Sequence, residues 1–143
     1  MQKIILPVFF LLATFVLPAQ TQTNTSVFFE TGRYELSPEA RQSLDLLTFQ
    51  LLVAPDYAVS IEAWTDDQGS DDYNLRLAAN RADAVKQYLA AKGLVLSKTT
   101  VHSWGEQNLE YDNTSEQSRQ MNRRVDVAVN SIFFRDYSAL RER

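Results

Sequence analysis

The 143-residue sequence contains no cysteine. Disulfide frameworks, zinc sites with thiolate ligands, iron–sulfur clusters and cysteine nucleophiles are therefore excluded. For the same reason we do not expect the acylated N-terminal cysteine of a bacterial lipoprotein. Basic residues are also few, with 14 Lys and Arg against 18 Asp and Glu and a formal net charge of −4. Because nucleic-acid binding requires a basic face, we expect no nucleic-acid partner.

The chain is poor in catalytic groups as well. Its one histidine, His102, is predicted to lie on a strand, and no nucleophile and orienting acid accompany it as a triad would require. Four aspartates in residues 66–72 do not form a calcium loop, because Asp71 and Leu77 stand where Gly and Glu are needed. These acids more simply cap a helix and complement its dipole. We expect no enzyme activity, no metal site and no cofactor.

Composition and patterning divide the chain into four parts. Residues 1–19 carry one positive charge before a long apolar run and are predicted to be a secretory signal peptide, with an uncleaved membrane anchor as the alternative. Residues 20–26 are polar and are predicted to be a tether. Residues 27–130 have globular composition and are expected to form one domain. Residues 131–143 are expected to extend the last strand or to dock as an appendage.

Local patterns within the domain predict a strand–helix–strand–helix–strand–helix–strand order. Ser37 and Pro38 are typical of a helix start, and Gly93 is typical of a helix end. Alternation of apolar and polar residues predicts half-buried strands. This order predicts an α+β fold with helices packed on one face of a mixed four-stranded sheet. The expected strands cover 27–29, 57–64, 100–104 and 125–130, and the expected helices begin near 37, 71 and 115.

One series of motifs spans the domain. From Ile61 the sequence reads IEAWTDDQGSDDYNLRLAANRADAVKQYLAAKG, and Gly105-Glu106 and a later NRRV follow. In order and spacing these motifs resemble the OmpA-like peptidoglycan-associated domain, which also occurs in MotB and Pal proteins. The resemblance covers about residues 27–130. The matching positions are Thr65-Asp66, Gly69, Tyr73-Asn74, Leu77, Arg81-Ala82, Val85, Tyr88-Leu89, Gly105-Glu106 and Asn122 to Val125.

The resemblance implies a ligand, the diaminopimelate residue of the peptidoglycan peptide stem. This zwitterion needs an acid for its ammonium and an arginine for its carboxylate, and by resemblance these are Asp66 and Arg81. Asn74 is expected to orient the loop or contact the ligand, and Arg124 to line the same pocket. Thr65 and Leu77 complete the expected binding residues. The alternative for the first two is a structural salt bridge without a ligand.

The chain also departs from the family pattern. Ala63 and Trp64 stand where the family has Gly and His, and Ala78 stands where it usually has Ser. An indole at position 64 could narrow the ligand pocket or stack on the ligand. The resemblance therefore implies an exported, non-catalytic module that binds peptidoglycan in the periplasm of a Gram-negative cell and links outer-membrane or periplasmic components to the cell wall. The alternative is a protein-interaction module that has lost cell-wall binding through the change at Trp64.

Overall fold

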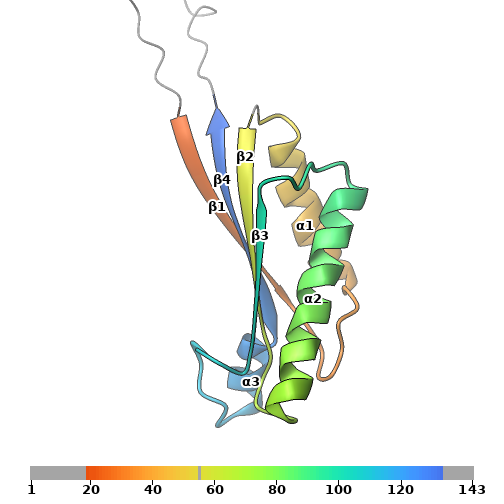
Figure 1. Ribbon diagram of the computed structural model, residues 1–143, viewed down its shortest axis with the longest axis vertical. Coiled ribbons are helices and arrows are strands. Elements are labelled where there is room, and N and C mark those ends of the chain that lie inside the picture. Colours follow the sequence, from red (N-terminus) through yellow and green to blue (C-terminus); the bar gives the residue numbers. More distant parts are fainter. Residues whose placement is uncertain (1–18, 55, 134–143) are drawn as a thin grey trace, which may run out of the picture.

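The computed structural model describes residues 19–54 and 56–133 (Figure 1). Its elements in chain order are β1 (Ala19–Phe28), α1 (Pro38–Leu51), β2 (Asp56–Trp64), α2 (Asp71–Ala91), β3 (Thr99–Gly105), α3 (Glu116–Asn122) and β4 (Arg124–Phe133). The strands form one sheet in the order β1-β4-β2-β3. The β1–β4 and β2–β4 pairs are antiparallel and the β2–β3 pair is parallel. The predicted α+β fold with a mixed four-stranded sheet is confirmed.

The core lies between the sheet and the two long helices, which cover one side of it (Figure 1). Because successive strand side chains point to opposite faces, alternate residues of β2 and β4 enter the core. The helix starts follow the predicted caps: the Ser37 hydroxyl accepts a hydrogen bond from the Ala40 amide, and the Ser70 hydroxyl accepts one from the Tyr73 amide. The buried core residues include Leu44, Leu47, Leu51, Val59, Ile61, Ala63, Val85, Leu89, Val125, Val127 and Val129.

The prediction of a tether at residues 20–26 is wrong for the described chain. These residues belong to β1, which pairs with β4 from Ala19↔Phe133 to Phe28↔Arg124. Sequence alternation could not reveal this strand because almost all of its side chains are polar. Its backbone hydrogen bonds come from a partner about a hundred residues away, and an edge strand can keep polar side chains in water.

The two ends of the chain were also predicted. Residues 131–133 extend β4, as one of the two expectations for the C-terminal extension stated. The remaining residues, 134–143, lie outside the described part of the chain. So do residues 1–18, and the signal peptide therefore stays a prediction. Of the helices that the structure describes, none is both long and apolar enough to cross a bilayer.

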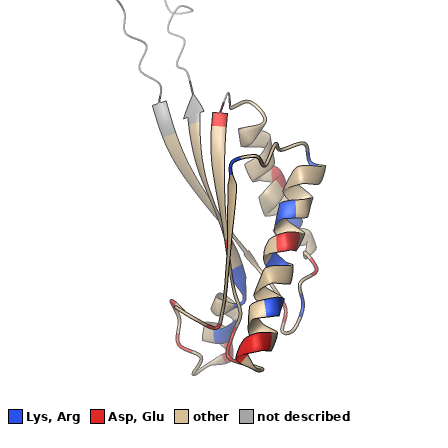
Figure 2. Cartoon of the chain, in the orientation of Figure 1, with Lys and Arg blue, Asp and Glu red and all other residues tan. Residues whose placement is uncertain are grey.

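Several connections and α3 meet at one end of the sheet, away from the end where Ala19 and Phe133 lie (Figure 1). The β1–α1 loop, the β2–α2 loop and the start of α2 all lie there. Charged residues of both signs gather at this end: Figure 2 shows basic residues in and beside α3 and acidic residues at the start of α2. This end of the molecule contains most of the residues that the motifs singled out.

Candidate ligand-binding cleft

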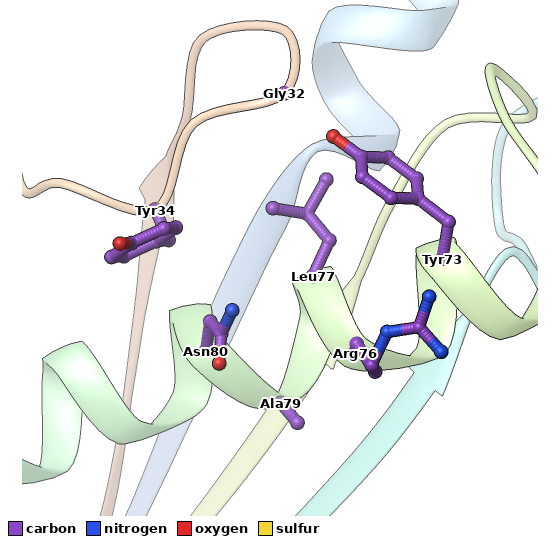
Figure 3. A pocket seen from close by; sticks show the side chains of 7 residues that line it. All are labelled: Gly32, Tyr34, Tyr73, Arg76, Leu77, Ala79 and Asn80. Atoms are coloured by element: carbon purple, nitrogen blue, oxygen red, sulfur yellow. The ribbon is translucent and has the colours of Figure 1, made fainter.

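A cavity of about 280 Å³ opens between the β1–α1 loop and the first half of α2. Leu77, one of the expected binding residues, lies in its wall between the loop and Tyr73 (Figure 3). The volume suits a small polar group rather than a large organic ligand. The residues that line the cavity are Gly32, Tyr34, Tyr73, Arg76, Leu77, Ala79 and Asn80.

Two glycines shape the approach to this cavity. Gly32 has a φ of 65° and Gly69 a φ of 128°, values that favour glycine over other residues. The Tyr73 side chain extends between them: a Cβ added at Gly69 would lie 2.8 Å from Tyr73 Cδ1, and one added at Gly32 would lie 3.4 Å from its hydroxyl oxygen. The two loops therefore approach Tyr73 closely because they lack side chains at these positions.

Arg81 lies on α2 one turn beyond Leu77, on the same face, and is fully buried. Its Nε donates to the Arg33 carbonyl at 2.8 Å, Nη1 to the Trp64 carbonyl at 3.0 Å and Nη2 to the Glu30 carbonyl at 3.1 Å. The guanidinium thus fastens the β1–α1 loop to the end of β2.

The buried position of Arg81 changes its proton affinity. Burial lowers the pKa of Arg81 to about 10, opposed by the negative charge of Asp66 and assisted by the positive charge of Arg123. Because this value is still well above 7, the guanidinium keeps its charge at neutral pH. The side chain therefore places a fixed, buried positive charge one helical turn beyond Leu77 of the cavity wall.

Asp66 is also buried, but it does not pair directly with Arg81. Its Oδ2 accepts a hydrogen bond from Arg123 Nη1 at 2.9 Å, and its Oδ1 accepts one from the Gln68 amide at 3.3 Å. Arg123 in turn donates to Glu116 at 2.8 Å. Burial acts to lower the pKa of Arg123, but its hydrogen bonds to Asp66 and Glu116 raise it above the ordinary value. The salt bridge considered for Asp66 and Arg81 is not among those of the described residues.

Arg123 is the residue at this site that the motif interpretation missed. The sequence placed it within the matching motif Asn122 to Val125 and assigned it no ligand contact. A signal was available, because Arg123 has the same parity as the apolar residues Val125, Val127 and Val129, and side chains two apart on a strand share a face. Residues of that parity face the helices and the core.

Arg124 does not line the expected pocket, and that prediction is wrong. Its side chain has the opposite parity and lies on the sheet face away from the helices, with its guanidinium 4.4 Å from the centre of the Trp64 ring. It donates to Asp126 at 3.0 Å and to Glu110 at 3.1 Å. Trp64 alternates with the buried Ala63, so its indole is directed away from Arg81 as well. It neither narrows the cleft nor stacks on anything within it.

Thr65 and Asn74 hold the loop beside Asp66. The Thr65 amide donates to the Gly105 carbonyl at 2.7 Å, and Asn74 Nδ2 donates to Glu106 Oε2 at 2.7 Å. The two residues of the Gly105-Glu106 motif thus each have a structural role: Gly105 accepts from the end of β2, and Glu106 accepts from the start of α2. Asn74 Oδ1, however, is buried and has no hydrogen-bond partner within the described part of the chain. An unpaired buried acceptor is costly unless a further donor reaches it.

The structure therefore brings four expected residues, Thr65, Asp66, Asn74 and Arg81, to the end of β2, with Leu77 in the cavity wall in front of them. The group combines a fixed positive charge with a carboxylate and an unpaired amide oxygen. Such a set can recognise a small zwitterion. Among residues 19–54 and 56–133 no cluster of side chains suits a metal ion.

Comparisons with known proteins agree with this geometry. The OmpA family model matches residues 28–123. The peptidoglycan-associated lipoprotein of Haemophilus influenzae is 36% identical over 107 residues, which are 75% of this chain and 70% of that protein. Outer membrane protein A of Shimwellia blattae is 35% identical over 120 residues, and the match covers 76% of this chain but only 50% of that longer protein.

Among solved structures, the peptidoglycan-associated lipoprotein of Burkholderia pseudomallei superposes with a TM-score of 0.69 at 28% sequence identity. The superposition covers 73% of this chain and 88% of that one. The likeness in sequence and the likeness in fold therefore point to the same set of proteins.

Proposed function

Because the chain belongs to the OmpA family, we propose that it is a non-catalytic module that binds peptidoglycan in the Gram-negative envelope. The ligand is the diaminopimelate of the peptide stem, and the module links periplasmic or outer-membrane components to the cell wall. The names of its relatives support this proposal, since two of the proteins compared are peptidoglycan-associated lipoproteins. Export to the periplasm is part of the proposal.

The observation that carries the proposal is the incomplete hydrogen bonding behind the cavity. A guanidinium has five N–H groups, and three of those on Arg81 are engaged by backbone carbonyls. The other two have no acceptor among the described residues, and we assign them to the ligand carboxylate. The unpaired Asn74 Oδ1 and the carboxylate of Asp66 are acceptors for the ligand ammonium. Opposite charges at the two ends of one small ligand would meet complementary groups.

The alternative, a protein-interaction module that has lost cell-wall binding, rested on the change at Trp64. That change does not obstruct the cleft, because the indole lies on the sheet face away from the helices, with Arg124. The expected binding residues Thr65, Asp66, Asn74, Leu77 and Arg81 all stand at positions that match the family motifs. We therefore propose peptidoglycan binding rather than its loss.

The test compares two kinds of purified sacculi in a pull-down with the purified protein. Stems that contain diaminopimelate offer both an ammonium and a carboxylate, whereas stems with lysine at that position lack the carboxylate. We expect binding to the lysine type to be roughly ten- to hundredfold weaker, because a charge-assisted hydrogen bond contributes about 1.5–3 kcal/mol. Free diaminopimelate should compete for the first type.

Asn74→Ala tests the unpaired acceptor, and Gln50→Ala, at an exposed position of α1 outside both the cleft and the sheet face away from the helices, serves as the matched control. We expect the first variant to bind diaminopimelate sacculi at least about fivefold more weakly and the control to bind as the native protein does. Melting temperatures measured on the same samples correct for any loss of folded protein. Equal binding of the native protein to both kinds of sacculi would overturn the ligand assignment.

A further inference from the structure

The face of the sheet that α1 and α2 leave uncovered contains a second hollow, of about 390 Å³. Side chains from three adjacent strands line it: Asn24 and Ser26 from β1, Asp126 from β4, and Ser60, Glu62 and Trp64 from β2. We call this hollow the groove. It lies on the opposite face of the sheet from the cleft and from Arg81, so its chemistry is independent of the cleft.

The polar groups of the groove are held in place by their neighbours. Asp126 accepts hydrogen bonds from Ser26 at 2.7 Å and from Arg124 at 3.0 Å. Glu62 accepts one from the indole nitrogen of Trp104 at 3.3 Å. Each carboxylate has further lone pairs that can accept hydrogen bonds from a ligand. Arg124 balances the charge of Asp126, whereas Glu62 has only the neutral indole N–H as a partner, so both carboxylates can accept hydrogen bonds from ligand hydroxyl groups.

Aromatic side chains border the groove. The Trp64 ring lies under the Arg124 guanidinium, and its buried indole nitrogen has no hydrogen-bond partner among the described residues. On β3, Trp104 and His102 stack with their ring centres 5.9 Å apart, and His102 is paired in register with Glu62. An aromatic surface beside fixed acceptors and amides presents an apolar face and hydrogen-bonding groups together.

We propose that the groove is a binding site for an uncharged sugar chain, of the chemistry of a β-1,4-linked N-acetylhexosamine strand. Asn24, Ser60, Glu62 and Asp126 offer the donors and acceptors that ring hydroxyls require, and the Trp64 indole offers a donor to a ligand oxygen. The apolar faces of the sugar rings pack against Trp104 and His102. None of the described residues that line the groove is basic, so the groove offers no partner for an anionic ligand.

The chain supplies its own reporter for this site. It has two tryptophans, Trp64 and Trp104, and both lie on this face of the sheet. A sugar that enters the groove should therefore change the intrinsic tryptophan fluorescence in a saturable way. A ligand in the cleft does not contact either indole, so the two sites can be followed separately.

The experiment titrates the full-length protein with chitotetraose. The sugar concentration extends to about 10 mM, because a weak site has a dissociation constant in the millimolar range. We expect a saturable change in fluorescence. Asn24→Ala should weaken binding about fivefold, as the loss of one neutral hydrogen bond predicts, and Trp104→Ala about tenfold through loss of the aromatic surface. Trp64 still reports binding in the second variant.

Arg76→Ala, at the cleft, is the matched control and should leave the response to chitotetraose unchanged. Competition by free diaminopimelate should also leave it unchanged, so a failure of the groove and a failure of the cleft are distinguishable. The proposal is overturned if the native protein gives no saturable change, or if Asn24→Ala and Trp104→Ala both respond as the native protein does.

Discussion

Arg123 and Arg124 are neighbours in the chain but lie on opposite faces of the sheet. Arg123 faces the helices, is almost fully buried, and bonds to the buried Asp66 and to the Phe29 carbonyl. Arg124 faces the uncovered side and bonds to Glu110 and Asp126, both of which have appreciable exposure. The same side-chain chemistry therefore operates in two different environments.

The comparison extends from single residues to the two faces. On the helix side, Arg81 and Arg123 both donate to backbone carbonyls of the β1–α1 connection, so buried charge holds the loop that forms the cleft. On the uncovered side, Arg124 covers one indole and fixes one carboxylate of the groove. Arg124 is buried as well, but its two carboxylate partners are partly exposed and can turn to water, whereas the Asp66 partner of Arg123 is buried. The two faces should therefore respond very differently to substitution.

The largest effect is expected for Arg81→Ala. The substitution leaves three backbone carbonyls without their charged donor and frees the β1–α1 loop, so we expect the free energy of unfolding to fall by about 4 kcal/mol. Urea denaturation measures this loss. Arg81→Lys should recover only part of it, because an ammonium cannot reproduce the planar fork that serves three acceptors. A loss below about 1 kcal/mol would contradict the proposed role of Arg81 in holding the loop.

The two neighbouring arginines provide a direct test of the difference between the faces. Arg123→Ala should lower the free energy of unfolding by about 3 kcal/mol because it leaves Asp66 buried and unpaired. Arg124→Ala should lower it by about 1 kcal/mol, since its partners can turn to water. Urea denaturation of the two variants, measured under the same conditions, checks both values. If Arg123→Ala and Arg124→Ala lowered the free energy of unfolding equally, the burial of the partner carboxylates would not be what distinguishes the two faces.

The smallest effect concerns acid pH. Hydrogen bonds from Arg123 and Arg119 lower the pKa of Glu116 below its ordinary value of 4.5 in the folded protein. Its contribution to stability is therefore fully present above the unfolded-state pKa and is lost as the pH falls through the lower folded-state pKa. Glu116→Gln should flatten the acid limb of a plot of unfolding free energy against pH. An unchanged acid limb would show that this exposed carboxylate contributes nothing measurable.

Much of the fold could be predicted because its signals are local. The Ser37 and Ser70 caps, the helical spacing of leucines and the alternation in β2 each depend on residues within a few positions of one another. β1 could not be predicted over its full length, because seven polar residues carry no local sign of the strand with which they pair. Strand pairing across about a hundred residues is a tertiary event.

The candidate site shows the same division between local and tertiary information. The motifs singled out Thr65, Asp66, Asn74 and Arg81, and the structure places these residues near one end of β2. The motifs did not indicate that Asp66 pairs with Arg123, or that Arg81 donates to three backbone carbonyls. Motif spacing indicates which residues are near one another, whereas the choice of hydrogen-bond partners depends on rotamers and on the path of a distant loop.

The amino-acid sequence by itself determined the composition class, the order of helices and strands and the residue types available to a zwitterionic ligand. Parity along a strand also indicates which residues share a face, but only the tertiary structure decided which of the two faces carries the cleft. The physical reason is the two-residue period of a strand: a shift of one position moves a side chain from the core to the solvent. Trp64 and Arg124 each stand next to a core-facing residue, Ala63 and Val125 respectively. Both therefore lie on the uncovered face of the sheet, with the groove, and not at the cleft.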